Sequence, residues 1–209
     1  VGGGGINTVI DGYEGYIPCF YTYNMWITLN IQGGTYVGQG EIVYSEKGDI
    51  NIYGGSYEVK VVNEEAGNQY LLNCNDKYVG GLANIKVYGG TFKNYNPATD
   101  GNDGSYLASG YVLSVKYTDD GYEIVASETA PTTNQVSING TYYETLNDAL
   151  KQVKSGETIV FNEAAATDGV IEGPGIQITA GHNVTIDLNG LTYEINNGMT
   201  GSTGSETNG

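Results

Sequence analysis

One eight-residue pattern governs the architecture of this chain: Ile50-Asn51-Ile52-Tyr53-Gly54-Gly55-Ser56-Tyr57. Its first half alternates branched aliphatic and polar residues, which is typical of a β-strand with one buried face. The glycines allow a bend at positive φ, so Gly54→Val is expected to strain the chain. A hydroxyl and an aromatic residue then resume the alternation. The pattern recurs at residues 29–36 and 85–92, and in degenerate form at 186–193.

The spacing of these copies indicates a solenoid. Gly33 and Gly54, which open the first two glycine pairs, are 21 residues apart, as suits one coil of a parallel β-solenoid. Gly89 follows 35 residues after Gly54, and the excess predicts a polar insertion around 63–69. An antiparallel sandwich also has many short strands. A sandwich gives no reason for one sequence pattern to recur. A solenoid does, because its coils bury equivalent faces against each other.

Stacking the copies in register predicts which side chains are buried. The inward positions form an aliphatic and an aromatic ladder: Ile31, Ile52 and Val87, then Tyr36, Tyr57 and Phe92. The outward positions form two further rows: Asn30, Asn51 and Lys86, then Gln32, Tyr53 and Tyr88. Glu58 and Lys93 become neighbours, and we expect an exposed ion pair worth about 0–1 kcal/mol.

Three stretches resemble a known superfold: NIYGGSY (51–57), VYGGTFKNYNP (87–97) and LASGY (107–111). They are similar to right-handed parallel β-helix repeat proteins of the pectin-lyase-like superfold. Such repeats occur in bacterial surface proteins and in bacteriophage fibres and spikes, often from gut communities. The resemblance covers roughly residues 27–126. It implies a fold rather than an activity, because this superfold hosts lyases, hydrolases, adhesins and inert stalks.

The repeats are followed by a change of pattern. Two alternating runs within 111–126 flank Asp119-Asp120-Gly121, which predicts a β-hairpin with a tight turn. The hairpin would cover the open edge of the last coil. Residues 127–134 have no period and contain Pro131, as in a linker. We therefore expect a β-helix domain with a terminal hairpin at 1–126 and a linker at 127–134.

A second unit is predicted at residues 135–196, followed by a flexible tail at 197–209. A strand pair at 136–143 precedes Thr145 and Asp148, which have the spacing of a helix capping box. Gly156 is expected to end that helix as its C′ residue. The helix and the phrase TIDLNG at 185–190 resemble the capping helix and first coil of a pectin-lyase-like β-helix. Since solenoids need about three coils, we expect the natural protein to continue or to stack on another chain.

The predicted fold class is therefore all-β. It comprises a right-handed parallel β-helix with a closing β-hairpin, then a short capping α-helix and the start of a second β-helix. Cys19 and Cys74 are too few for a disulfide scaffold. Whether they pair is left open, and the alternative is two small buried side chains.

The charge balance excludes several partners. The chain has 24 acidic residues, 8 lysines and no arginine, for a net charge of −16. This opposes binding to nucleic acid or to an anionic membrane, which depends on basic residues. No run approaches the roughly 18 apolar residues of a membrane span. We predict no nucleic-acid partner and no membrane insertion.

Catalytic sets are not evident in the sequence. Pectate-type lyases commonly use an arginine base, which this chain lacks, and glycoside hydrolases need carboxylates about 5–10 Å apart. Asp187 is the one acid inside the repeated phrases, and alternation points it outwards. His182 has no second histidine or cysteine nearby, which argues against zinc. We predict no enzyme activity and no cofactor.

Two groups of residues are binding candidates. Asp100, Asn102 and Asp103 offer oxygen ligands as a weak calcium candidate, but a solvated turn is the favoured interpretation of this segment. Tyr53 and Tyr88, with Asn51 and Lys86, offer rings beside polar groups, as carbohydrate-binding surfaces do. Packing is the favoured interpretation of these tyrosines from the sequence, because tyrosine favours strands, and a glycan or partner surface is the alternative. The same holds for a second aromatic cluster at 20–26.

These observations predict a non-enzymatic structural or adhesive module on a virion or an extracellular cell surface. We expect a bacteriophage fibre, spike or capsid-decorating protein that binds host surface glycans. The lack of an evident export or anchoring segment favours it over the alternative, a bacterial cell-surface β-helix adhesin. A polysaccharide lyase or glycoside hydrolase with its site outside this chain is the alternative of a different class. The expected partners are its own copies, with a trimer favoured, or other virion or surface proteins.

Overall fold

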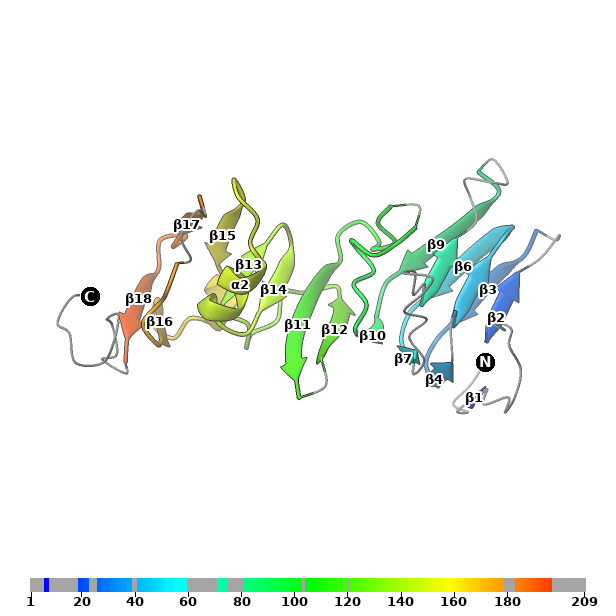
Figure 1. Cartoon of the computed structure of the whole chain (residues 1–209), viewed down its shortest axis with the longest axis horizontal. Coiled ribbons are helices and arrows are strands. Elements are labelled where there is room, and N and C mark those ends of the chain that lie inside the picture. The colour runs from blue at the N-terminus through cyan, green and yellow to red at the C-terminus, as the bar shows by residue number, and fades with distance from the viewer. Residues whose placement is uncertain are drawn as a thin grey trace. The chain divides into compact units, whose positions relative to one another are not determined.

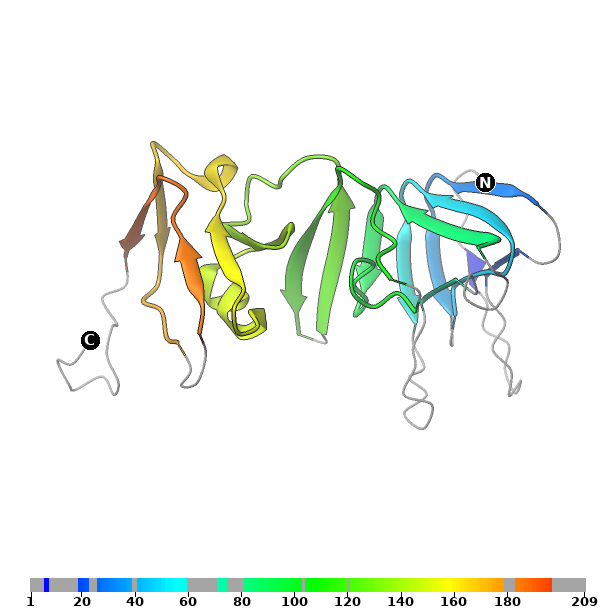
Figure 2. The same ribbon diagram turned by 90° about the horizontal axis from the view of Figure 1, so that it is seen from above.

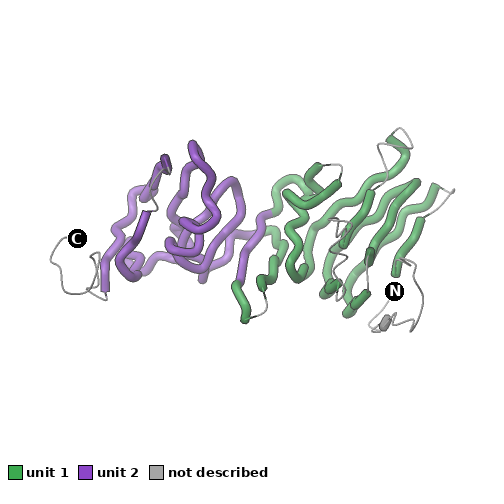
Figure 3. The backbone as a smooth tube through the Cα atoms, viewed as in Figure 1, with its two compact units in different colours: residues 1–111, 117–128 green, residues 112–116, 129–209 purple. Residues whose placement is uncertain are grey.

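The computed structural model describes residues 6–7, 19–22, 26–38, 41–59, 71–74, 81–102, 104–119, 121–178 and 183–196. The predicted insertion at 63–69 lies outside them, as do Asp103, Asp120, His182 and the tail from 197. The chain forms two compact units, one of residues 1–111 and 117–128, the other of residues 112–116 and 129–209 (Figure 3). The described residues are mostly β-strands and include one α-helix. The all-β class is therefore confirmed.

The first unit is built from three parallel sheets, through which the chain passes three times. Its passes are β2 (Phe20–Thr22), β3 (Thr28–Ile31) and β4 (Thr35–Gly38); β5 (Val43–Ser45), β6 (Gly48–Ile52) and β7 (Ser56–Val59); and β8 (Leu72–Cys74), β9 (Ala83–Val87) and β10 (Gly90–Lys93). Counterparts from successive passes pair in parallel, giving the sheets β2-β5-β8, β3-β6-β9 and β4-β7-β10 (Figure 1, and from above in Figure 2). The short strand β1 (Ile6–Asn7) pairs with β4.

The register of these sheets confirms both predicted inward ladders. Ile31 pairs with Ile52 and Ile52 with Val87, and each of the three side chains is at most 1% exposed. Tyr36, Tyr57 and Phe92 are equally buried, and their rings stack with centroids 5.2 and 5.1 Å apart. Burial of this apolar surface is the main stabilising contribution of the repeat.

The two glycines of each pair have different roles, and these differ from the roles expected from the sequence. Positive φ belongs to the second glycine of each pair, with 118° at Gly34, 111° at Gly55 and 116° at Gly90. Gly54 is required for another reason, because a Cβ there would approach the carbonyl oxygen of Gln32 in the preceding pass. The expected positive φ at Gly54 is therefore wrong. The hydroxyl of Tyr57 donates to the carbonyl of Gly54 at 2.8 Å, which adds a second constraint.

The edge of the third pass is covered on all three sheets. The strand β12 (Gly121–Ser127) pairs antiparallel with β10, so the predicted closing strand of the hairpin is confirmed. Leu107 forms a parallel bridge with Val87 at the edge of β9. At β8, the side chain of Asn102 accepts from the backbone N–H of Cys74 at 3.1 Å and donates to its carbonyl at 2.8 Å. The segment after β10 therefore supplies partners to β8 and β9.

The second unit combines antiparallel and parallel pairs. Its strands are β11 (Val112–Thr118, of which 112–116 belong to this unit), β13 (Val136–Ile138), β14 (Thr141–Tyr143), β15 (Thr158–Phe161), β16 (Val170–Gly173), β17 (Thr185–Asp187) and β18 (Thr192–Ile195). The predicted strand pair is confirmed, because β13 pairs antiparallel with β14. Three pairs of its strands are parallel: β11 with β14, β15 with β17, and β16 with β18. A short 3-10 helix, η1 (Glu163–Ala165), follows β15.

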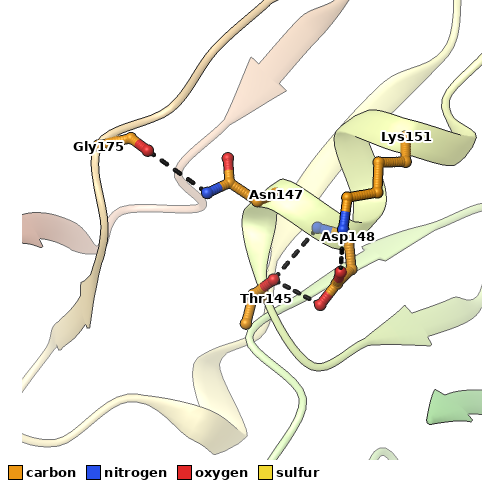
Figure 4. A network of polar contacts seen from close by, with 5 residues as sticks. All are labelled: Thr145, Asn147, Asp148, Lys151 and Gly175. Atoms are coloured by element: carbon orange, nitrogen blue, oxygen red, sulfur yellow. Dashed lines mark hydrogen bonds and ion pairs between the residues drawn. The ribbon is translucent and has the colours of Figure 1, made fainter. Parts of the chain in front are cut away.

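The helix α2 (Leu146–Gln152) begins at the predicted cap. The Thr145 hydroxyl accepts from the backbone N–H of Asp148 at 3.1 Å and donates to its carboxylate at 2.6 Å (Figure 4). Lys151 pairs with the same carboxylate at 2.9 Å. The predicted stop at Gly156 is wrong, because Val153 leaves the helix with ψ 132° and is the C-cap. Gly156, with φ 89°, lies in the turn that follows.

The second half of the predicted linker is bound to the second unit. Asn134 is 4% exposed, and its amide donates to the carbonyls of Val115 and Tyr142. The amide of Asn162 in turn donates to the carbonyls of Pro131 and Asn134 at 2.7 and 2.8 Å. Since buried polar groups need partners, these bonds order residues 131–134.

Candidate functional site

The predicted site residues come together on the outer face of the β3-β6-β9 sheet. Because Ile31, Ile52 and Val87 point inwards, the residues on either side of them point outwards. The pairing Asn30–Asn51–Lys86 makes one outer row. The same register places Gln32, Tyr53 and Tyr88 in the next row, just after the strands end. We call these two rows the outer face.

Two tyrosine rings stack on the outer face. The ring centroids of Tyr53 and Tyr88 are 4.8 Å apart and their planes differ by 13°. Tyr111 meets Tyr88 edge-on at 5.3 Å. Tyr53 is 44% exposed. Tyr88 covers one face of the Tyr53 ring.

The amide row lies directly beside these rings. The side-chain nitrogen of Asn51 donates to the side-chain oxygen of Asn30 at 3.0 Å. Lys86 is exposed and lies opposite Asn51 in the register. The outer face therefore offers an aromatic surface, an amide pair and an ammonium group within neighbouring positions.

One acidic residue on the outer side of this sheet was not predicted from the sequence. The strand β6 begins at Gly48, two residues before the repeated phrase, and so adds Asp49 to the outer side of the sheet. The carboxylate of Asp49 accepts from the amide of Asn84 at 3.3 Å. Asp187, the acid singled out from the sequence, lies in β17 of the second unit and accepts from the backbone N–H of Asn189 at 2.8 Å.

Of the calcium candidates, Asp100 and Asn102 lie in the described part of the chain, and their side-chain oxygens already accept hydrogen bonds from other groups of the protein. Asp100 accepts from the backbone N–H of Asn96 and the hydroxyl of Thr99, both at 2.8 Å. The side-chain oxygen of Asn102 receives the N–H of Cys74 and the hydroxyl of Tyr106. These oxygens hold the turn and the edge of β8. In the described part of the chain, no group of three or more His, Cys, Asp or Glu side chains could hold a metal ion.

The second aromatic cluster lies on a different sheet. Tyr21 stacks on Tyr44 at the outer side of the β2-β5-β8 sheet, with centroids 5.0 Å apart and planes within 4°. Trp26 is 66% exposed, with the ammonium group of Lys47 5.2 Å from its ring centroid. Sequence reasoning missed Tyr44 because no glycine pair follows it. The remaining residues of the cluster, 23–25, lie outside the described part.

Two further features of the β2-β5-β8 sheet bear on its chemistry. Cys19 and Cys74 are not joined in a disulfide, and Cys74 is buried opposite Ser45. Burial raises the pKa of Glu41, and a hydrogen bond from the amide of Asn73 opposes that rise.

None of the described helices has the length and apolar character needed to cross a membrane. No protein-family model, curated protein or solved structure matches this chain. Its function is therefore inferred from the geometry of its own residues.

Proposed function

We propose that this chain is a non-enzymatic structural and adhesive module of a virion or cell surface. We place it with bacteriophage fibre, spike or capsid-decorating proteins, and assign to its outer face the binding of host surface glycans. The observation that carries the proposal is the Tyr53–Tyr88 stack, in which Tyr53 is exposed and Tyr88 half-buried, beside the amides of Asn30 and Asn51. Aromatic rings pack against the apolar faces of sugars, while amides bond their hydroxyls.

We infer that the first unit is a right-handed parallel β-helix and that the second is the start of another, with α2 as its cap. What supports this is the in-register parallel pairing of three successive passes. The right hand follows from the strong preference for right-handed connections between parallel strands. Stacked coils provide rigid length and a repetitive flank, which suit an appendage or a decorating layer.

The scarcity of acidic residues on the outer side of the β3-β6-β9 sheet supports binding without catalysis. Glycoside hydrolysis generally uses a pair of carboxylates. One acidic residue, Asp49, occurs in this sheet within residues 28–32, 49–53 and 84–88. Its carboxylate already accepts a hydrogen bond from the side-chain amide of Asn84. A flat face with rings and amides suits adhesion to a sugar surface.

The test is a host-glycan array probed with the wild-type chain and the double variant Tyr53→Ala/Tyr88→Ala. Losing contacts worth about 1.4 kcal/mol weakens binding about tenfold, so we expect at least that loss. Tyr21→Ala is the matched control, because Tyr21 is 48% exposed and also stacks on a tyrosine. It should bind as the wild type does. Unchanged binding by a folded double variant would overturn the proposal.

A further inference from the structure

Lys86 has an unusual setting on the outer face. It continues the row of Asn30 and Asn51, so a charged side chain stands where the earlier passes have neutral amides. Lys86 lies two residues before Tyr88 on the same side of β9. Diagonal neighbours on adjacent strands lie about 7–8 Å apart, a distance that the four-carbon stem of lysine spans. The ammonium group can therefore reach a ligand held against Tyr53.

The charge of Lys86 is not neutralised within the described structure. Lys93 pairs with Glu58 at 3.2 Å, which confirms the ion pair predicted from the sequence. Lys47 lies over Trp26. Among the residues that the structure describes, Lys86 has no ion-pair partner, and its side chain is exposed. The nearest acid along this face, Asp49, is diagonal to Lys86 and accepts from Asn84.

The amide pair beside Lys86 has one acceptor and one donor that its own hydrogen bond does not use. Asn51 uses its side-chain nitrogen and Asn30 its side-chain oxygen in their mutual hydrogen bond. The oxygen of Asn51 and the nitrogen of Asn30 are left for a ligand. Asn51 can then accept from a sugar hydroxyl beside the ammonium group of Lys86, while Tyr53 offers the ring face that Tyr88 does not cover.

We propose that the glycan bound here is anionic, with a carboxylate or sulfate group paired to Lys86 and a sugar ring against Tyr53. This rests on the proposed function and names its ligand class. The hydroxyl groups of a neutral sugar replace the water around the ammonium group about evenly, so they gain little from its charge. An anionic group forms a charge-assisted hydrogen bond, about twice as strong as a neutral one. The net charge of −16 does not oppose this at physiological salt, where exposed charges beyond about 8 Å are largely screened.

The test uses matched probe pairs that differ in one anionic group. They are 3′-sialyllactose and lactose, trigalacturonate and its methyl ester, and 6-sulfated and unsulfated lactose. We expect the wild type to bind the acidic member of at least one pair at least tenfold more tightly, and added NaCl to reduce this preference. The preferred pair identifies the group as carboxylate or sulfate.

Three variants locate the effect. Lys86→Met should bind both members of the preferred pair equally, with neutral binding unchanged, which also shows that the variant is folded. Lys86→Arg should keep the preference, and Lys116→Met, at an exposed lysine of the second unit, should behave as wild type. Equal binding of both members by the wild type, with no effect of Lys86→Met, overturns the anionic ligand and leaves the proposed function standing. Failure to bind any probe overturns both.

Discussion

A Cβ atom built on Gly54 would lie 2.8 Å from the carbonyl oxygen of Gln32 in the preceding pass. Side-chain carbons do not approach backbone oxygens so closely. Gly89 stands in the same relation to Tyr53 one pass later. The first glycine of the second and third pairs is therefore kept by contact with the preceding pass. The second glycine of all three pairs is kept by its positive φ.

Gly54→Ala should destabilise the first unit by about 1–3 kcal/mol, because the backbone of one pass must shift to admit the methyl group. Gly33→Ala is the control, since its Cβ would meet no described atom within 4 Å. Guanidinium unfolding at equilibrium measures both. Equal midpoints for Gly54→Ala and wild type would disprove the close contact.

Asn102→Ala should cost about 1–3 kcal/mol, because the carbonyl of Cys74 loses its hydrogen bond from the side-chain amide, while the N–H keeps the Tyr106 hydroxyl as an acceptor. Asn183→Ala, at an exposed asparagine, should change little. Adding calcium to the wild type should leave the thermal midpoint unchanged, since the Asn102 oxygen is engaged. A midpoint that rises with calcium would instead favour the metal site considered from the sequence.

Glu41→Gln should raise the thermal midpoint at pH 7. Burial raises the pKa of Glu41 in the folded state, so its stabilising contribution is full below the unfolded pKa and is lost as pH rises through the folded one. Glutamine cannot ionise and can still accept from Asn73. The difference between variant and wild type should shrink towards zero as pH falls to about 4. A difference independent of pH would contradict the burial effect.

Thr145→Ala should destabilise the second unit by about 1 kcal/mol, because α2 loses its N-cap hydrogen bond to the backbone of Asp148. Thr132→Ala, at an exposed threonine of the same unit, serves as the control. Thermal unfolding followed by circular dichroism distinguishes the two. Identical curves would mean that packing of Leu146 and Ala149 alone fixes the start of the helix.

The ladders of the first unit could be predicted because two signals coincide at residues such as Ile52 and Tyr57. Alternation selects the inward side, and the repeated glycine pair fixes the register. The β2-β5-β8 sheet lacks that pair, so Tyr44 and the stack it forms were not predicted. The role of Asn102 was also hidden, because its amide bonds Cys74, 28 residues away in sequence.

The outer face was predicted in part. Alternation placed Tyr53, Tyr88, Asn51 and Lys86 on one side, but it could not indicate that one tyrosine ring covers a face of the other. The start of β6 at Gly48 was missed because Gly48 itself breaks the alternating pattern, so Asp49 was overlooked. The homo-oligomer and the virion setting stay predictions, since no described residue bears on them.

The glycan face is tested most directly by nuclear magnetic resonance of the tyrosine rings. The wild-type chain is labelled with ¹³C in its tyrosine rings and titrated with the tightest ligand from the array. We expect the signals of Tyr53, Tyr88 and Tyr111 to shift together in a saturable way, while that of buried Tyr57 stays in place. Shifts confined to Tyr21 and Tyr44, or no saturable shift in any ring, would contradict a binding site on the outer face.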